Sequence, residues 1–245
     1  MKIDILTLFP GMFAGVFEES IIAKAKERGL LDIAITNIRD HATDKHHVTD
    51  DEPFGGGAGM VMKADVLGRA VAEVVARCQG PVARRRMVLL SPQGKKFDQE
   101  KAKQLSQYSN VVLICGRYEG VDERVMDVVD EEISIGDFVN TGGEIPAMII
   151  VDAVARMIPE VLGDEDSAKQ DSFYYDILDH DHYTRPAEID GVGVPEVLIC
   201  GDHDKVRRFR RSNALGNTLF KRPDLLAKAG LNDEDKLLLK ELIQG

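Results

Sequence analysis

Three short segments of this chain offer main-chain groups, rather than reactive side chains, to a ligand. Residues 135–144 hold three glycines, residues 115–120 hold two, and the third segment is Ser91, Pro92, Gln93 and Gly94. Because glycine lets another molecule approach the main chain closely, N–H and C=O groups there can bind a flat, neutral ligand. Each segment follows an apolar run. If those runs are neighbouring parallel strands, the segments meet at one sheet edge and form a pocket; three ordinary strand-to-helix turns are the alternative.

A fourth glycine-rich segment, residues 54–60, lies nearer the start of the chain. Its N–H groups could cradle a phosphate, or the segment could be a flap that approaches a ligand or a partner subunit. The next lysine, Lys63, is four residues beyond Gly59 rather than adjacent to it. We therefore favour the flap, and expect Gly59 to contact the substrate.

Several familiar catalytic motifs are missing. GxxxxGK[ST], a GxGxxG after the first strand, and GxSxG do not occur, so P-loop chemistry, an ordinary Rossmann site and a serine nucleophile elbow are not indicated. Histidines occur as a group, His41, His46 and His47, and as an HxH pair, His180 and His182. Without a nearby cysteine or an HExxH, we interpret them as solvated loop residues and predict no metal site.

The composition narrows the setting. The chain has 245 residues, 44% of them hydrophobic, which can support one large domain or two small ones. Cys78, Cys115 and Cys200 are widely spaced and odd in number, which favours a reducing cytoplasm over a disulfide framework. We expect no membrane span and no signal peptide, because no apolar run is long enough and the start lacks a cleavage site.

Charge is distributed unevenly. The formal net charge of −11 argues against nucleic-acid binding when taken alone. Between Gly201 and Arg222, however, seven basic residues face two acidic ones, so the local formal charge is +5. This stretch, which includes Arg208 and Arg211, could bind a polyanion; a solvated helix face is the alternative.

Strand-like and helix-like runs alternate over the first 160 residues. Short, continuous apolar runs are typical of strands buried on both faces, so the alternation predicts an α/β domain with a largely parallel sheet. The expected strands are Lys2–Leu8, Leu31–Ile38, Met87–Leu90, Val111–Cys115 and Glu132–Ile135. The expected helices are Met12–Arg28, Ala64–Cys78, Asp98–Gln107 with Asp98 as N-cap, Glu123–Val129 and Ile145–Ile158.

The alternation stops at Pro159, and residues 159–186 are polar, acidic and aperiodic. We predict domain 1–160, a linker at 161–172, and a small, mostly helical domain at 173–245. In the last, we expect Asp202 to cap a basic helix to about Ser212 and Pro223 to start a second. A final amphipathic helix is expected from residues 231–234 to Ile243.

Two isolated charged residues complete the candidates. Asp171 lies in the predicted linker, where a helix N-cap would explain it equally well. Arg156 follows the main glycine segment by one helix, where it could be a simple surface residue.

Taken together, the motifs resemble the family of bacterial tRNA (guanosine-37 N1) methyltransferases. They occur in the expected order over essentially the whole chain, which makes the combination far more specific than one glycine loop. The matching segments are Phe54–Met60, Leu90–Gly94, Gly116–Arg124, Ser134–Asp137, Gly142–Glu144, Asp171–Phe173 and His182–Pro186.

The resemblance implies a SPOUT-type parallel sheet with a deep trefoil knot, an exception to the usual connection rules. It also implies a homodimer with an active site shared between subunits, and a C-terminal domain that binds the tRNA anticodon stem-loop, with Arg208 and Arg211 in its basic run. S-adenosylmethionine would bind in the knot, mainly through main-chain groups. The residues implied are Ser91, Pro92, Gly116, Ile135, Gly136, Asp137, Phe138, Val139, Asn140, Gly142 and Gly143.

The implied reaction is methyl transfer to N1 of guanosine 37, next to the anticodon. Guanine N1 carries a proton, which Asp171 would accept as general base, while Arg156 would stabilise the negative charge that develops on O6. Glu119 matches a position near the target base. The family is described as magnesium-dependent, although no dedicated Mg²⁺ cage is visible here.

Two positions depart from the family pattern, since residue 138 is Phe where Tyr is common and residue 140 is Asn where Leu is frequent. Main-chain contacts there would tolerate both changes. A SPOUT ribose 2′-O-methyltransferase is the nearest alternative function, and a non-catalytic RNA-binding protein is the alternative from another class.

Overall fold

The computed structural model describes residues 1–78, 81–163 and 167–244. The chain divides into two compact units, Met1–Gly163 and Asp164–Gly245. Each unit has its own hydrophobic core, so each has the packing of a small domain.

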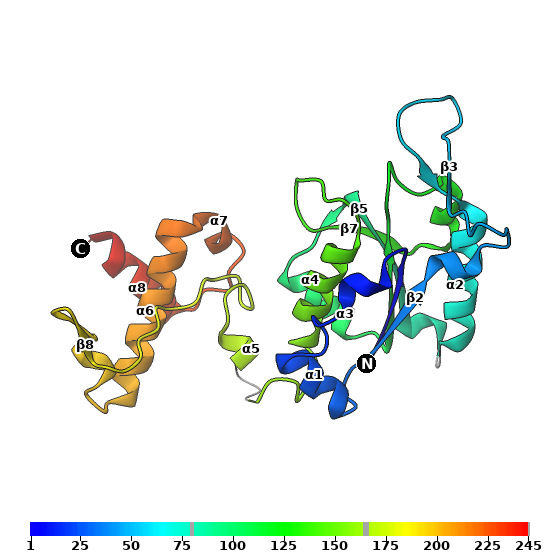
Figure 1. Cartoon of the computed structure of the whole chain (residues 1–245). Coiled ribbons are helices and arrows are strands. Elements are labelled where there is room, and N and C mark those ends of the chain that lie inside the picture. The colour runs from blue at the N-terminus through cyan, green and yellow to red at the C-terminus, as the bar shows by residue number, and fades with distance from the viewer. Residues whose placement is uncertain (79–80, 164–166, 245) are drawn as a thin grey trace. The chain divides into compact units, whose positions relative to one another are not determined.

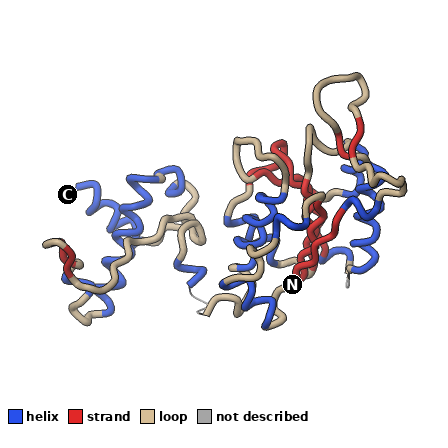
Figure 2. Tube along the Cα trace, viewed as in Figure 1, coloured by secondary structure: helices blue, strands red, loops and turns tan. Residues whose placement is uncertain are grey.

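Five parallel strands form the central sheet of the first unit, in the order β2-β1-β6-β5-β7 (Figure 2). Every residue of β6 is buried, as expected for a strand with both sheet faces covered. The predicted parallel α/β sheet is thus confirmed, while the knotted threading stays a prediction. The strands are β1 Lys2–Thr7, β2 Asp32–Asn37, β5 Arg85–Lys96, β6 Asn110–Cys115 and β7 Glu131–Ser134.

Helices cover both faces of this sheet (Figure 1). Helices α1 (Ser20–Glu27), α3 (Gln99–Ser106) and α4 (Glu144–Ala155) pack in the core on one face, and α2 (Ala64–Arg77) packs in the core on the other. Side chains of a strand alternate between its faces. Accordingly, Val111, Leu113 and Cys115 of β6 belong to the first core, and Val112 and Ile114 belong to the second.

The predicted helix Met12–Arg28 is wrong over its first half. Its first part is a 3-10 turn, η1 (Pro10–Phe13), and α1 begins only at Ser20. Gly15 and Ser20 have φ values of +88° and +57°, and this left-handed backbone interrupts a right-handed helix. Glu123–Val129 also differs, because residues Glu123–Val128 form a 3-10 helix, η4.

Strand β5 is much longer than the predicted Met87–Leu90. It continues through the Ser91–Gly94 segment to Lys96, with a register shift between Leu90 and Lys95 against β7. A Cβ on Gly94 would lie 2.5 Å from the Glu132 carbonyl carbon, so the two main chains are in direct contact. The segment is therefore a bulged strand rather than the expected turn.

The remaining elements of the first unit are short. Asp98 caps α3 as predicted, since its Oδ1 accepts a hydrogen bond from Lys101 N at 2.8 Å. A two-residue ladder, β3 (Asp50–Asp51) with β4 (Val61–Met62), frames the glycine-rich residues 54–60. The other 3-10 turns are η2 Ile38–His41 and η3 Val82–Arg84.

The second unit is mostly helical. Asp202 accepts a hydrogen bond from Lys205 N at 3.1 Å and caps α6, as predicted. That helix runs to Lys221 rather than ending near Ser212, because Ala214 and Leu215 pack in a core with Leu238 of the last helix. The elements are α5 Ser167–Gln170, β8 Glu188–Ile189, β9 Val192–Gly193, η5 Glu196–Leu198, α6 His203–Lys221, α7 Pro223–Leu226 and α8 Asp233–Gln244. Within the described ranges, no helix is both long and apolar enough to cross a bilayer.

Candidate functional site

The predicted sheet-edge site starts from three adjacent strands. Leu90 of β5 pairs with Cys115 of β6 on one side and with Ile133 of β7 on the other. Residues 116–120 and 135–143 therefore leave the sheet at the edge where the bulge of β5, residues 91–94, also lies. The structure thus brings together the three segments that the sequence singled out.

Two of these segments are fixed to each other through their main chains. Gly143 N donates to Gly116 O at 2.9 Å, and Arg117 forms an antiparallel bridge with Gly142. A Cβ on Gly143 would lie 2.6 Å from the Cys115 Cα, a distance that no folded backbone tolerates. Glycine is therefore required at this position by the close approach of β6 and the start of α4.

Residues 135–140 form the most exposed part of the edge. Ser134 Oγ donates to Gly136 O at 2.9 Å and accepts from Gly136 N, which fixes the turn after β7. Phe138 and Val139 are 57% and 83% exposed, and Asp137 pairs with Lys96 at 2.5 Å. A ligand can therefore reach this loop, as the prediction requires.

Ser91 and Pro92 lie in the bulged part of β5. Ser91 Oγ accepts a hydrogen bond from Gln93 N at 3.1 Å, and Pro92 is exposed. At the end of β6, burial raises the pKa of the Cys115 thiol well above its usual range. This cysteine is therefore a protonated packing residue rather than a nucleophile at the site.

A buried ionic network supports the edge, and sequence reasoning missed it. Glu144 is fully buried at the start of α4; its Oε1 accepts from Thr7 Oγ1 at 2.7 Å and its Oε2 from Arg117 Nε at 3.0 Å. Arg117 also donates to Thr141 O at 3.0 Å and covers the Phe9 ring at 4.3 Å. The sequence did carry one signal for this network, because Arg117 and Glu144 are opposite charges that lie within two of the glycine segments.

The predicted substrate residues Gly59 and Glu119 lie in contact. A Cβ on Gly59 would lie 2.8 Å from the Glu119 Cδ, and its φ is +83°. Main-chain hydrogen bonds join the two segments, including Glu119 N to Met60 O at 3.0 Å. The glycine-rich flap is therefore attached to the loop that follows β6.

Arg156 and Asp171 belong to different compact units. Arg156 is the C-cap of α4, so it lies at the end of the helix that begins beside the glycine loops. Asp171 directly follows α5 and begins a turn, in which Tyr174 N donates to Asp171 O at 3.3 Å. It is not a helix N-cap, and its pairing with Arg156 stays a prediction.

The predicted tRNA-binding arginines of α6 are engaged in ion pairs with α8. Arg208 contacts Glu241 at 3.0 Å, and Arg211 binds both carboxylate oxygens of Asp235, at 2.7 and 2.8 Å. Asp235 is only 1% exposed, and the Arg211 guanidinium lowers the pKa of its carboxyl group. Arg211 therefore has a structural task, whatever its role towards RNA.

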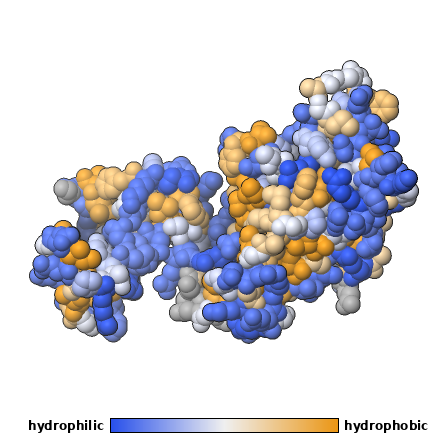
Figure 3. All heavy atoms as spheres, viewed as in Figure 1, coloured by the Kyte–Doolittle hydropathy of each residue, from blue (hydrophilic) through white to orange (hydrophobic). Residues whose placement is uncertain are grey.

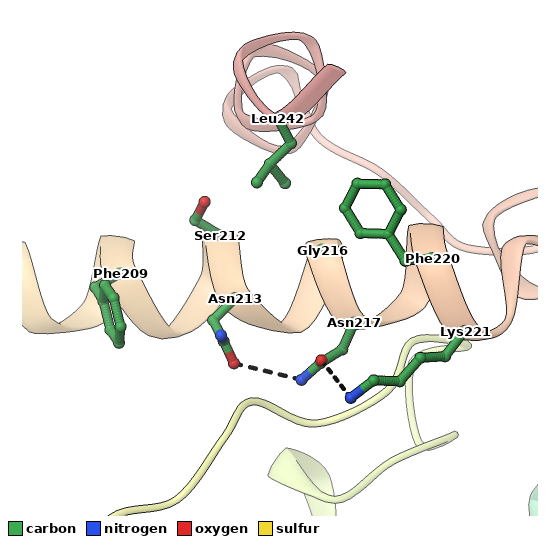
Figure 4. Close-up of a pocket in the computed structure, with 8 residues that line it drawn as sticks. All are labelled: Phe209, Ser212, Asn213, Gly216, Asn217, Phe220, Lys221 and Leu242. Atoms are coloured by element: carbon green, nitrogen blue, oxygen red, sulfur yellow. Dashed lines mark hydrogen bonds between the residues drawn. The ribbon is translucent and has the colours of Figure 1, made fainter. Parts of the chain in front are cut away.

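A pocket of the second unit lies on α6 rather than at the glycine loops. Three of its lining residues follow one another along the helix and are joined by hydrogen bonds, as Figure 4 shows: Asn213, Asn217 and Lys221. Its lining also includes Phe209, Ser212, Gly216, Phe220 and Leu242. The pocket therefore lies where α6 faces Leu242 of α8.

Comparison with known proteins decides the family. Residues 1–228 match the family described as tRNA (Guanine-1)-methyltransferase TrmD. The chain belongs to this family. A tRNA (guanine-N(1)-)-methyltransferase of Syntrophomonas wolfei subsp. wolfei is 53% identical over 243 residues, which cover 99% of this chain and 97% of that relative.

Other TrmD relatives match over similar lengths. A protein of the same name from Pelotomaculum thermopropionicum is 54% identical, with 99% of this chain and 96% of the relative covered. Another, from Carboxydothermus hydrogenoformans, is 53% identical, with 98% and 92% covered. Membership of the TrmD family places the chain among methyltransferases with a SPOUT-type α/β fold, for which S-adenosylmethionine is the methyl donor.

Proposed function

We propose that the protein transfers the methyl group of S-adenosylmethionine to N1 of a tRNA guanine, at guanosine 37 beside the anticodon. The main support is the main-chain-lined edge formed by three glycine segments in a chain that belongs to the TrmD family over residues 1–228. A site of this kind suits a ligand whose largest part is a flat, neutral adenine ring.

The chain's residues fit the methyl donor. Close packing of Gly143 on Cys115 leaves main-chain groups, rather than side chains, to line the edge between β6 and α4. Residues Ile135 to Asn140 and Gly116 would bind the donor through N–H and C=O groups, with Ser91, Pro92 and Gly142 alongside. When bound, S-adenosylmethionine supplies a methyl group on a sulfonium that departs as a neutral thioether.

Asp171 would act on the guanine. The N1 proton passes to the carboxylate while the N1 lone pair forms the new bond to the methyl carbon. A carboxylate is a weak base for this proton, so stabilisation of the negative charge on O6 is needed, and Arg156 would provide it. Glu119 and Gly59, which already lie in contact, would position the base.

A homodimer is part of this proposal, because Arg156 and Asp171 need not come from one chain. The face of the first unit that carries α4 gathers apolar side chains (Figure 3). Ile145 and Ile149 of α4 are 47% and 44% exposed, and Val16 is 45% exposed. A second copy that covers this face would remove apolar area from water, which favours association.

Mg²⁺ would act without a protein cage. Among the described residues, one group of three potential ligands lies close together, and it contains two imidazoles, which suit transition metals rather than Mg²⁺. We therefore place Mg²⁺ on the tRNA or in a hydrated contact.

The test is methyl transfer from labelled S-adenosylmethionine to tRNA transcripts that carry guanosine or adenosine at position 37, followed by nucleoside analysis. One-methylguanosine that forms only with guanosine 37 is the expected product. Ribose methylation would instead assign the chain to 2′-O-methyl transfer, and tRNA binding without any product would favour a non-catalytic role.

A further inference from the structure

A second cluster of chemically active side chains lies in the C-terminal unit, away from the glycine loops in sequence. Asp179, His180 and His182 each offer one ligand atom, and these three atoms all lie within 4.8 Å of one another. The sequence showed only the HxH pair. Turn geometry adds the carboxylate, since His182 Nε2 lies 2.9 Å from Asp179 Oδ2 and His180 Nε2 lies 3.9 Å from Asp179 Oδ1.

The tautomer of His180 is set by the main chain of the next residue, Asp181. Its Nδ1 lies 3.0 Å from the Asp181 carbonyl oxygen, which can only accept, so Nδ1 carries the proton. Nε2 therefore presents its lone pair on the side of Asp179. A metal-binding histidine in proteins ordinarily has this arrangement, with one ring nitrogen donating to a carbonyl and the other free to ligate.

Helix α6 holds this segment in place through its asparagines. Asn217 Nδ2 donates to Asp179 O and to Asp181 Oδ1, both at 3.0 Å, and Asn213 Oδ1 accepts from Asp181 N at 2.6 Å. These are the asparagines drawn in Figure 4, where a loop passes on their side of the helix. The ligand-bearing segment is thus anchored before any ion arrives, which lowers the ordering cost of binding.

Local charge also favours a cation. Asp179 and Asp181 contribute two carboxylates, while Lys221 approaches from α6 and donates to Asn217 Oδ1 at 2.7 Å. Two carboxylates against one ammonium leave a net negative environment when both histidines are neutral.

From these contacts we propose that Asp179, His180 and His182 form a binding site for a divalent transition metal, with Zn²⁺ as the best match. Two imidazoles and a carboxylate form a donor set that Zn²⁺ uses with a fourth position open to water. Zn–N distances are about 2.0–2.1 Å, so the ligands must close slightly around the ion. His182 can supply that movement, because its side chain is 71% exposed. This site takes no part in the chemical step of the proposed methyl transfer, and it is not a site for Mg²⁺.

The site also adjoins the proposed base in sequence and in hydrogen bonding. Asp179 N donates to Ser172 Oγ at 2.9 Å, and Ser172 follows Asp171 directly. An ion at Asp179 would therefore brace the segment that carries Asp171.

The experiment uses the untagged, full-length protein with Cys200→Ser as background, because Cys200 is exposed and its thiol could bind zinc. Zn²⁺ is titrated against a chelating dye, with Mg²⁺ in excess, and Co²⁺ is bound in parallel to record its visible absorption. We expect one Zn²⁺ per chain and the intense Co²⁺ bands of a four-coordinate site. Uptake of no metal, or a weak spectrum of hydrated Co²⁺, would overturn the proposal.

Matched variants locate the ion. His182→Ala removes an exposed ligand without a buried contact and should weaken Zn²⁺ binding about tenfold or more. His203→Ala removes another exposed histidine, outside the cluster, and should leave binding unchanged. Equal binding by the two variants would show that the metal lies elsewhere. Asp179→Asn should weaken binding like His182→Ala, since an amide oxygen is a poorer ligand than a carboxylate.

Discussion

The sheet edge of the first unit and the basic helix α6 of the second differ in what their charged residues do. At the edge, glycines and main-chain atoms are locked together, as by Gly143 N to Gly116 O, and the charges Arg117 and Glu144 lie beneath as support. On α6, residues that look like a ready-made polyanion site are largely neutralised. The comparison teaches that a run of like charges in a sequence overstates the charge available to a ligand.

The neutralising partners come from α8. Arg207 pairs with Glu234 at 3.1 Å, and Arg208 and Arg211 pair with Glu241 and Asp235. Within the described part of the chain, Arg210 has no such ion pair, and it is exposed. Of this run, Arg210 is therefore the arginine best placed to meet phosphate without first breaking an internal contact.

Removal of Asp171 should separate binding from chemistry most strongly. Because a general base contributes about 10²–10⁴-fold to a rate, Asp171→Ala should lower single-turnover methyl transfer by that order while the sheet-edge site still binds S-adenosylmethionine. Rapid quench and calorimetry measure the two quantities. A wild-type rate in the variant would remove Asp171 from the mechanism.

Gly143→Ala, in contrast, should weaken the binding of S-adenosylmethionine itself. The new Cβ would meet the Cys115 Cα at 2.6 Å, and overpacking of this kind costs about 1–3 kcal/mol even where side chains can yield. We expect S-adenosylmethionine affinity to fall by about tenfold or more, together with a lower melting temperature. Gly68→Ala is the matched control, since a Cβ there meets nothing within 4 Å. Unchanged affinity in Gly143→Ala would mean that the donor binds away from this edge.

Much of the sheet could be predicted, because local pattern decides it. The buried run Val111–Cys115 and the caps Asp98 and Asp202 depend on neighbours only a few residues away. The bulged passage of β5 past Glu132 depends on contact with a strand about forty residues later, which no local pattern contains.

In the candidate site, too, local features could be predicted and contacts between distant residues could not. Its glycine segments are local motifs and were found from the sequence. The Thr7–Glu144 contact spans 137 positions and the Arg208–Glu241 pair spans 33, so their partners could not be assigned before the fold was known. Asp179 escaped notice for a different reason, since only the turn directs it towards His182.

Variants of Arg211 and Arg210 measure the difference between an arginine of α6 that is paired with α8 and one that is not. Arg211→Met leaves Asp235 buried without its cation, and we expect a loss of about 1–3 kcal/mol in stability, less than for a fully buried pair because Arg211 is 31% exposed. Arg210→Met should leave the melting temperature unchanged, weaken tRNA binding a few-fold and lower its salt dependence by about one ion. Differential scanning calorimetry and filter binding at several salt concentrations test both. If Arg211→Met weakened tRNA binding without loss of stability, the neutralisation argument would be wrong.

The same ion pair should give the second unit a specific sensitivity to acid. The Arg211 guanidinium lowers the pKa of Asp235 in the folded protein, whereas the pKa of this carboxyl group in the unfolded chain is about 3.9. The stability from this pair is therefore fully present above that unfolded pKa, and it is lost as pH falls through the lower folded pKa, because the unfolded chain takes up the proton first. Asp235→Asn lacks this contribution, so its unfolding free energy should lie below that of the wild type at pH 7, and the two should converge as pH falls below 4. Urea unfolding across this pH range measures the difference. Parallel curves for the two proteins would show that the carboxylate charge contributes nothing to the α6–α8 contact.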